Sequence, residues 1–129
     1  MSTESLRKRA ARIEPVELRD LAVAVLEDAK AQDVAVFDLR ERNTFADFMI
    51  VASGTSSRQN KAMADRLVMR VKQADLPPPL GVEGEREGEW VLVDLTDVVV
   101  HLMLPQTRAF YNLEKLWDDS TRAASAPAT

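Results

Sequence analysis

Two valine-rich runs with a polar break between them constrain the fold of this chain more than any other stretch. They lie within residues 89–104 (EWVLVDLTDVVVHLML), and the break falls at residues 94–97. β-Branched side chains favour a pleated surface, and two such runs around a short polar break are typical of a β-hairpin. Because an isolated hairpin is only marginally stable in water, this one needs further strands and a covering layer.

Side chains alternate between the two faces of a strand, so the predicted hairpin has two chemically different faces. The aliphatic face holds Val91, Val93, Leu95, Val98, Val100, Leu102 and Leu104. The mixed face holds Trp90, Leu92, Asp94, Asp97, Val99, His101 and Met103. The aliphatic face indicates a buried core. The mixed face is neither dry core nor fully polar surface, and we interpret it as a binding face.

The rest of the chain predicts the layers around this hairpin. Apolar residues at helical spacing indicate helices starting near Glu14 and after Ser56, and apolar runs indicate strands at 34–39, 48–52 and 80–84. A last helix follows, capped by Thr107, with its apolar positions at Phe110, Leu113, Leu116 and Trp117. The order αββαβββα predicts a single-domain α/β sandwich on a mixed five-stranded sheet.

Domain boundaries follow from composition. Residues 1–13 are polar and basic and predict a flexible lead-in, residues 14–119 form the α/β domain, and residues 120–129, rich in Ala, Ser, Thr and Pro, predict a disordered tail. The lead-in carries Arg7, Lys8, Arg9 and Arg12, which favour a solubilising arm, with a minor contact to RNA as the alternative.

Composition excludes several classes of function. The chain has no cysteine and one histidine, which excludes thiol catalysis and argues against a zinc site. No apolar run approaches the roughly 18 residues of a spanning helix, so we expect a cytoplasmic protein. The formal net charge of −4 does not favour general attraction to nucleic acid and suits a basic protein partner better.

The turn Gly54-Thr55-Ser56-Ser57, between a strand and a helix, has two interpretations. Free N–H groups at a helix start can cradle a phosphate, but the turn lacks the lysine of a P-loop and the glycine pattern of dinucleotide-binding folds. Ser56 and Gln59 have the spacing of a capping box. Helix capping is the favoured interpretation.

Four carboxylates allow an enzymatic alternative. Glu83, Glu85, Asp94 and Asp97 could gather at one end of the sheet, as acids do in a Mg²⁺-dependent nucleotidyl transferase, where they act beside a Gly-Ser turn. In that alternative Gly54, Ser56, Glu83, Glu85 and Asp97 form the site. Turn residues that bond local backbone amides explain Asp94 and Asp97 more simply, so we expect no catalytic residue, metal or cofactor.

Trp90 and His101 belong to the mixed face. A lone imidazole on a strand cannot form a metal cluster or a nucleophile relay with other histidines or cysteines. Trp90 fits either ordinary core or an exposed anchor, and aromatic residues inside an acidic rim are common at protein-binding hot spots.

Four motifs in order resemble the ribosomal silencing factor family, also called RsfS or Iojap. They are Asp47–Gln59, Gly81–Gly84, Trp90–His101 and Tyr111–Trp117, and the resemblance covers residues 16–119. Thr96 departs from the family pattern, since many members have Gly there.

The resemblance implies a nucleotidyltransferase-like fold without the catalytic set. It also implies a factor that binds the large ribosomal subunit through its protein L-fourteen, blocks subunit joining and represses translation under nutrient limitation, with a homodimer in the free state. Under this resemblance the partner-binding residues are Glu83, Trp90, Leu92, Asp94, Asp97, Val99 and His101.

Overall fold

The computed structural model describes residues 13–42 and 45–121, without the side chains of 118–121. Nearly all of the predicted basic lead-in, and residues 122–129 of the predicted tail, lie outside this described part. The last helix extends to Thr121, two residues past the boundary that the sequence predicts.

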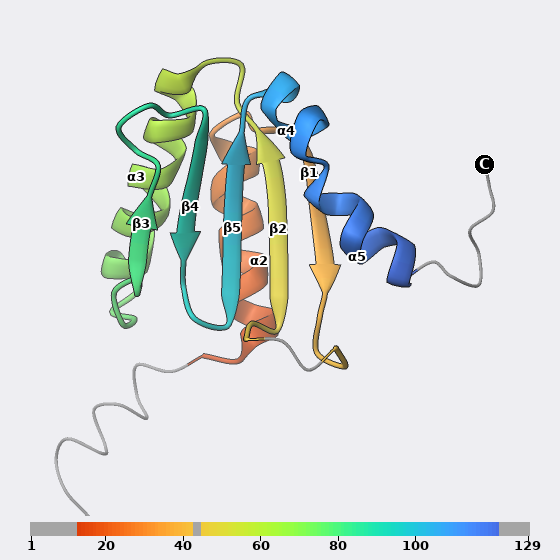
Figure 1. Ribbon diagram of the computed structural model, residues 1–129. Helices are drawn as coiled ribbons and strands as arrows, with labels where there is room; N and C mark the ends of the chain where they lie inside the picture. Colours follow the sequence, from red (N-terminus) through yellow and green to blue (C-terminus); the bar gives the residue numbers. More distant parts are fainter. Residues whose placement is uncertain (1–12, 43–44, 122–129) are drawn as a thin grey trace, which may run out of the picture.

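Five strands form one mixed sheet in the order β1-β2-β5-β4-β3 (Figure 1). The strands are β1 (Gln32–Asp38), β2 (Phe48–Ser53), β3 (Gly81–Glu83), β4 (Trp90–Asp94) and β5 (Val98–Met103). The pairs β1/β2, β3/β4 and β4/β5 are antiparallel, whereas β2 and β5 are parallel. The hairpin and the mixed five-stranded sheet predicted from the sequence are therefore confirmed.

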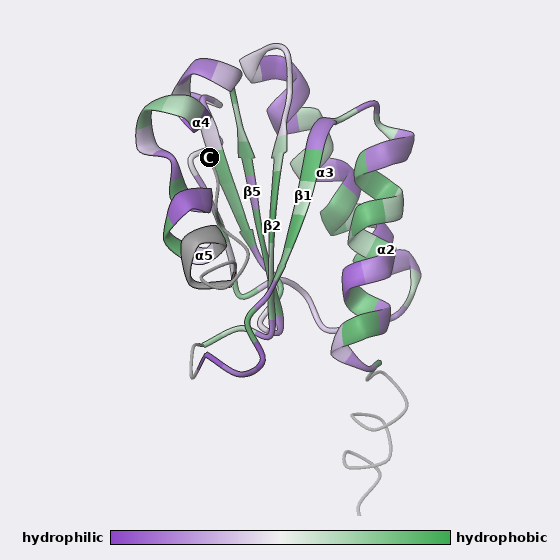
Figure 2. Cartoon of the chain, turned by 90° about the vertical axis from the view of Figure 1, so that its right-hand side faces the viewer, coloured by the Kyte–Doolittle hydropathy of each residue, from purple (hydrophilic) through white to green (hydrophobic). Residues whose placement is uncertain are grey.

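The helices of the described part lie in two layers, one on each side of the sheet (Figure 2). Helices α2 (Pro15–Asp28) and α3 (Ser57–Gln73) cover one face, and α4 (Pro105–Tyr111) and α5 (Leu113–Thr121) lie against the other. Helix α2 begins as predicted, with Pro15 in its first turn and a capping box between Glu14 and Glu17. Within the described residues, no helix has the length and apolar character needed to cross a bilayer.

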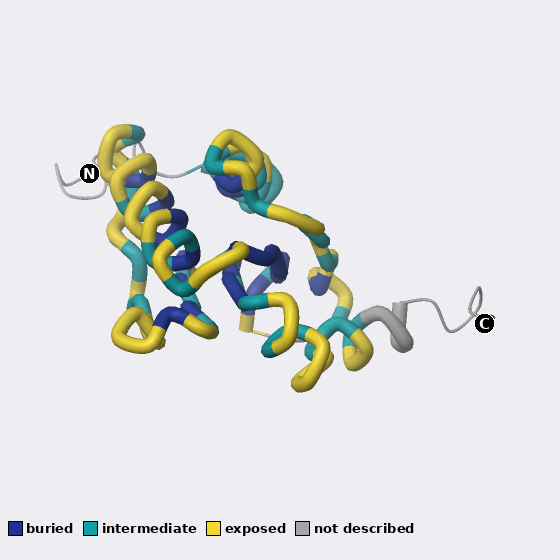
Figure 3. The backbone as a smooth tube through the Cα atoms, turned by 90° about the horizontal axis from the view of Figure 1, so that it is seen from above, coloured by how far each residue is buried: buried dark blue, intermediate teal, exposed yellow. Residues whose placement is uncertain are grey.

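The aliphatic face of the hairpin forms the main core. Val91, Val93, Val98 and Val100 are fully buried and pack with residues of α2 and α3. All six residues of β2 are buried because helices cover both of its faces. In the view from above, the buried parts of the helices point toward the sheet (Figure 3).

The last predicted helix is wrong in two respects. The structure has two helices there, and the first of them begins at Pro105 with Leu104 as its N-cap, so Thr107 lies inside the helix and does not cap it. Asn112 takes a left-handed conformation with φ 49° and ends α4, and α5 starts in a new direction at Leu113. Leu113 and Trp117 pack on a second core cluster as expected. Phe110 and Leu116, two of the predicted apolar positions, are 79% and 64% exposed, because the break at Asn112 changes the phase of the apolar stripe.

Candidate functional site

The mixed face of the sheet is only partly covered. Helix α5 packs over β1 and β2 through a second core cluster that includes Met49, Val51 and Trp117, and it does not extend over β4 (Figure 1). The residues on this face of β4 are half-buried. We call this part the open sheet face, and its residues are Glu83, Leu92, Asp94, Val99 and His101.

Strand register brings these five residues together. Leu92 on β4 pairs with His101 on β5, and Asp94 pairs with Val99. Glu83, at the edge strand, pairs with Leu92 from the other side. Cβ atoms of directly opposed residues lie about 4.5–5.5 Å apart, so the open sheet face is one continuous patch. It combines two apolar side chains with an imidazole and two carboxylates.

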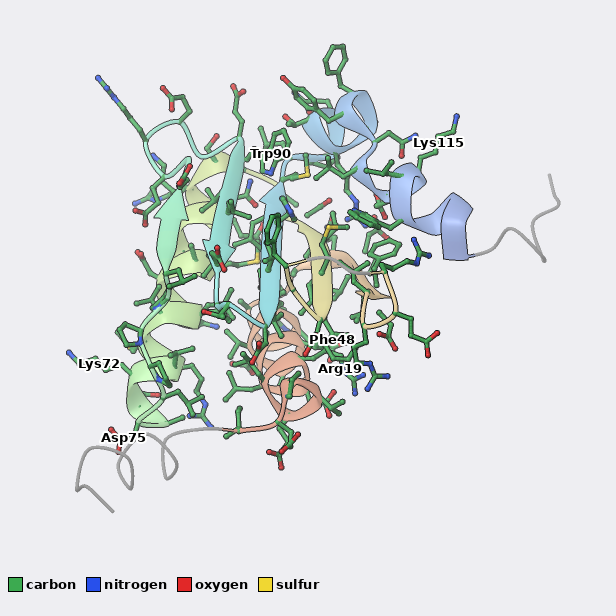
Figure 4. All side chains as sticks on the ribbon, turned by 60° about the horizontal axis from the view of Figure 1, so that its bottom comes forward. Arg19, Phe48, Lys72, Asp75, Trp90 and Lys115 are labelled. Carbon is green, nitrogen blue, oxygen red and sulfur yellow. The ribbon has the colours of Figure 1, made fainter. Side chains whose placement is uncertain are left out.

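Trp90 lies at the upper end of this patch and is held by specific contacts (Figure 4). Its indole Nε1 donates a 2.9 Å hydrogen bond to Nδ1 of His101, and the two ring centroids are 5.9 Å apart. The Trp90 ring also contacts Tyr111 of α4 at 4.9 Å between centroids. Trp90 is half-buried and packs against the second core cluster, so it is neither a fully buried core residue nor a fully exposed one.

His101 is neutral in this environment. Burial lowers its pKa from 6.5 to about 4, because the low-dielectric surroundings disfavour the imidazolium. Since Nδ1 accepts the indole hydrogen, the ring proton of the neutral form lies on Nε2. The bond therefore fixes both the tautomer of His101 and the orientation of Trp90.

Aromatic side chains of α4 extend this surface, and sequence reasoning assigned them no surface role. Tyr111 is 54% exposed, and the Phe110 ring packs edge-on against it at 5.0 Å between centroids. We call Trp90, Phe110 and Tyr111 the aromatic cluster. A signal was present in the sequence: two consecutive aromatic residues cannot both face the core from one helix, because successive residues point about 100° apart.

An ion pair holds the elbow between α4 and α5. The Arg108 guanidinium donates from Nε and Nη2 to both carboxylate oxygens of Glu114, at 2.8 and 2.9 Å. Its Nη1 donates to the Ser53 hydroxyl at the end of β2, at 2.9 Å. Bidentate bonds of this kind fix geometry as well as charge. The elbow thereby positions the aromatic cluster on the sheet.

Asp94 and Asp97 make different hydrogen bonds at the hairpin turn. The Asp94 carboxylate accepts a 2.9 Å bond from the N–H of Thr96, which confirms its predicted role in the turn. The carbonyl of Asp97 accepts bonds from the N–H groups of Asp47 and Phe48, which ties the hairpin turn to the start of β2. Asp97 is thus at the lower end of the sheet, away from Trp90.

A cavity of about 680 Å³ lies at this lower end. Asp97 lines it together with Leu18 of α2, Leu76 after α3 and Leu95 in the hairpin turn. The cavity belongs to the α2 side of the molecule, so it is separate from the open sheet face.

The residues of the alternative magnesium site do not lie close together. Gly54 and Ser56 follow the end of β2, whereas Asp97 bonds to its first residue. The six residues of β2 therefore separate them, by roughly 17–20 Å. Over the described ranges 13–42 and 45–121, no three or more His, Cys, Asp or Glu side chains gather closely enough to hold a metal ion.

The turn after β2 caps α3, as predicted. Ser56 Oγ accepts from the N–H of Gln59 at 3.1 Å. The return bond differs from the prediction, because Gln59 Oε1 accepts from the N–H of Thr55 and not from that of Ser56. The Gln59 amide also donates to the carbonyls of Ala29 and Lys30, which joins the start of α3 to the end of α2.

Comparison with known proteins places this chain in a family. The family model described as "Ribosomal silencing factor during starvation" matches residues 12–128. The chain belongs to the ribosomal silencing factor family. A protein of Chromobacterium violaceum named ribosomal silencing factor RsfS is 45% identical over 101 residues, which are 78% of this chain and 82% of that protein. The protein of the same name from Zymomonas mobilis is 39% identical over 124 residues, covering 94% and 92% of the two chains.

Two further similar proteins extend the comparison. A mouse protein named mitochondrial assembly of ribosomal large subunit protein 1 is 37% identical over 100 residues, covering 76% of this chain and 44% of its own. A crystal structure of a Chromobacterium violaceum protein superposes with a TM-score of 0.78 at 40% identity, covering 90% of this chain and 92% of that one. The ribosomal silencing factor resemblance and the α/β fold are thus confirmed. The nucleotidyltransferase-like label stays a prediction.

Proposed function

We propose that this ribosomal silencing factor family member binds the large ribosomal subunit through its open sheet face and aromatic cluster. The observation that carries the proposal is the half-open patch on β4 and β5, in which Leu92, Val99 and His101 meet a rigidly held Trp90. Family membership supports a regulatory role at the large subunit. The relatives named above are called silencing factors, which supports a non-enzymatic function.

The surface has the composition of a binding hot spot. Aromatic anchors at the centre and a polar rim are typical of protein interfaces. Here Trp90 is fixed before binding by His101 and Tyr111, so little side-chain entropy is lost on docking. Exposed Phe110 and Tyr111 add apolar area next to the sheet.

The charge of the surface favours a basic partner. Glu83 and Asp94 lie on the open sheet face, and Glu85, Glu87 and Glu89 follow in the exposed segment between β3 and β4. Complementary charge speeds encounter and suppresses wrong partners more than it sets affinity. A basic ribosomal protein fits this face better than a phosphate backbone does.

We infer the partner protein, the mode of repression and the oligomeric state from the family resemblance. The partner is protein L-fourteen of the large subunit, and occupation of its surface sterically blocks the small subunit. This represses translation in the cytoplasm during nutrient limitation. The free protein is a homodimer, which would compete with docking if it covered the same face. Asp97 belongs to the rim only if the partner reaches the hairpin turn.

Titration with purified protein L-fourteen tests the partner. Leu92→Glu places a charge at the centre of the open sheet face, and Ala24→Glu places the same charge on the exposed side of α2. We expect saturable binding of the unaltered chain, about 30-fold or more weaker binding of Leu92→Glu, and no change for Ala24→Glu. Absence of saturable binding by the unaltered chain would remove L-fourteen as the partner.

A further inference from the structure

The outer face of α3 is strongly basic, although the chain as a whole is acidic. Five of its 17 residues are basic and one is acidic. The whole chain has 17 basic and 21 acidic residues, so the remainder holds 12 basic and 20 acidic ones. The basic residues of α3 are Arg58, Lys61, Arg66, Arg70 and Lys72. The helix buries its opposite side, through residues such as Met63, Leu67 and Val71.

Ion pairs inside the protein do not account for these charges. Arg66 approaches the Asp28 carboxylate at 3.6 Å, and both side chains are more than half exposed, so the pair contributes little. Arg58, Lys61, Arg70 and Lys72 form no ion pair with any other residue in the described part of the chain. Arg58, Arg70 and Lys72 are exposed, whereas Lys61 is half-buried. These four positive charges are therefore not neutralised within the described residues.

The helix dipole accounts for the positions of only two of these four positive side chains. Arg70 and Lys72 lie in the last turn, where the helix dipole favours a positive charge. Arg58 is the second residue of the helix, where the dipole disfavours a cation, and the first turn contains no acidic residue that would compensate. A role outside the folded chain accounts for this placement better than helix stability does.

The shape of the face suits a polyanion. From Arg58 to Lys72 the helix rises roughly 21 Å, and the side chain of Lys72 extends away from the body (Figure 4). Helix α3 belongs to the layer opposite α4 and α5 (Figure 2). Spaced cations along an exposed helix match the repeated charges of a nucleic-acid backbone, where contacts to phosphate position a protein without reading sequence.

We propose that the outer face of α3 contacts the phosphate backbone of ribosomal RNA while the open sheet face holds a ribosomal protein. This inference rests on the proposed docking to the large subunit, whose surface presents RNA beside its proteins. The two layers of the molecule then bind partners of opposite charge, the acidic sheet side a basic protein and the basic helix side an RNA.

Matched charge neutralisation tests the inference. The double variant Arg58→Gln with Lys72→Gln removes two charges from α3, and Lys30→Gln with Lys115→Gln removes two exposed charges elsewhere. Affinity is measured as a function of salt concentration, for isolated large subunits and for a short protein-free RNA duplex. We expect the α3 variant to lower the slope of log affinity against log salt by about 2 on both targets, and the control variant to leave the slope unchanged.

The outcomes separate the two proposals. Equal behaviour of the two double variants overturns the RNA contact and leaves α3 as a solvated helix face. A loss of subunit affinity without any binding of the naked duplex also overturns it, and indicates an acidic protein partner. If the unaltered chain binds the duplex through α3 but does not bind large subunits, the docking function fails while the RNA contact of α3 stands.

Discussion

The indole Nε1 of Trp90 donates to Nδ1 of His101 across 2.9 Å, so one bond joins the aromatic anchor to the single histidine of the chain. The bond crosses from β4 to β5 on the open sheet face. It requires the imidazole to be neutral, because a protonated Nδ1 cannot accept a hydrogen bond. The geometry of the proposed docking surface is therefore linked to pH.

The stability of the fold should fall as pH decreases from 6.5 toward 4. The unfolded chain protonates His101 near pH 6.5, whereas in the folded chain its pKa is about 4. The stabilisation is thus complete above pH 6.5 and is lost as pH falls through this window, by on the order of 3 kcal/mol. Asp38, whose pKa the bonds from Arg40 lower to about 2, titrates below this range.

Urea unfolding at pH 7, 6 and 5 measures this effect. The variant His101→Gln removes the titrating group, so its free energy of unfolding should change much less between pH 7 and 5. Parallel pH profiles for the two proteins would show that His101 is not the group responsible.

Trp90→Phe should destabilise the domain by about 1–3 kcal/mol, because it leaves the partly buried Nδ1 of His101 without its donor. Tyr111→Phe is the control. It keeps the ring that contacts Trp90 and should change stability by less than about 0.5 kcal/mol. Equal effects of the two changes in chemical denaturation would mean that ring packing, and not the hydrogen bond, holds Trp90.

Thr96→Gly should stabilise the protein. Thr96 has φ 77° in the hairpin turn, a conformation that costs a residue with a Cβ roughly 1–2 kcal/mol and is unusual for a β-branched one. Glycine removes this strain but gains freedom in the unfolded chain, which leaves a net gain of about 0.5–1 kcal/mol. Thermal unfolding of Thr96→Gly and Thr96→Ala tests the argument, and a gain in Thr96→Ala as large as in Thr96→Gly would refute it.

The Arg108–Glu114 pair should contribute much more than the Asp38–Arg40 pair. The side chains of Arg108 and Glu114 are 12% and 28% exposed, against about half for the other pair. Double-mutant cycles with neutral glutamine or asparagine should give about 1–3 kcal/mol of coupling for the first pair and much weaker coupling for the second, because solvent screens an exposed pair. Similar coupling energies would show that the elbow is not held by this ion pair.

The sequence predicted the strands well because their apolar patterns are strong. The hairpin, the fully buried β2 and the edge strand β3 are all present. The parallel pairing of β2 with β5 was not predicted, because periodicity shows which residues are buried and not which strands are neighbours. The break at Asn112 was missed as well, since a single left-handed residue leaves no periodic signal.

The candidate site was only partly accessible to sequence reasoning. Alternation along β4 and β5 assigned Leu92 and His101 to one face, and the register confirms that they are paired. The bond between Trp90 and His101 depends on side-chain rotamers, which alternation does not specify. Asp97 was assigned to the same face because the alternation was continued into a turn, where it no longer holds.

Sedimentation with separated ribosomal subunits tests whether the open sheet face docks on the large subunit. The unaltered chain, Leu92→Glu and Ala24→Glu are each mixed with large or small subunits and centrifuged, after circular dichroism has shown that all three are folded. We expect the unaltered chain and Ala24→Glu to sediment with the large subunit alone and Leu92→Glu to stay in the supernatant. Sedimentation of folded Leu92→Glu to the same extent as the unaltered chain would contradict the open sheet face as the docking surface.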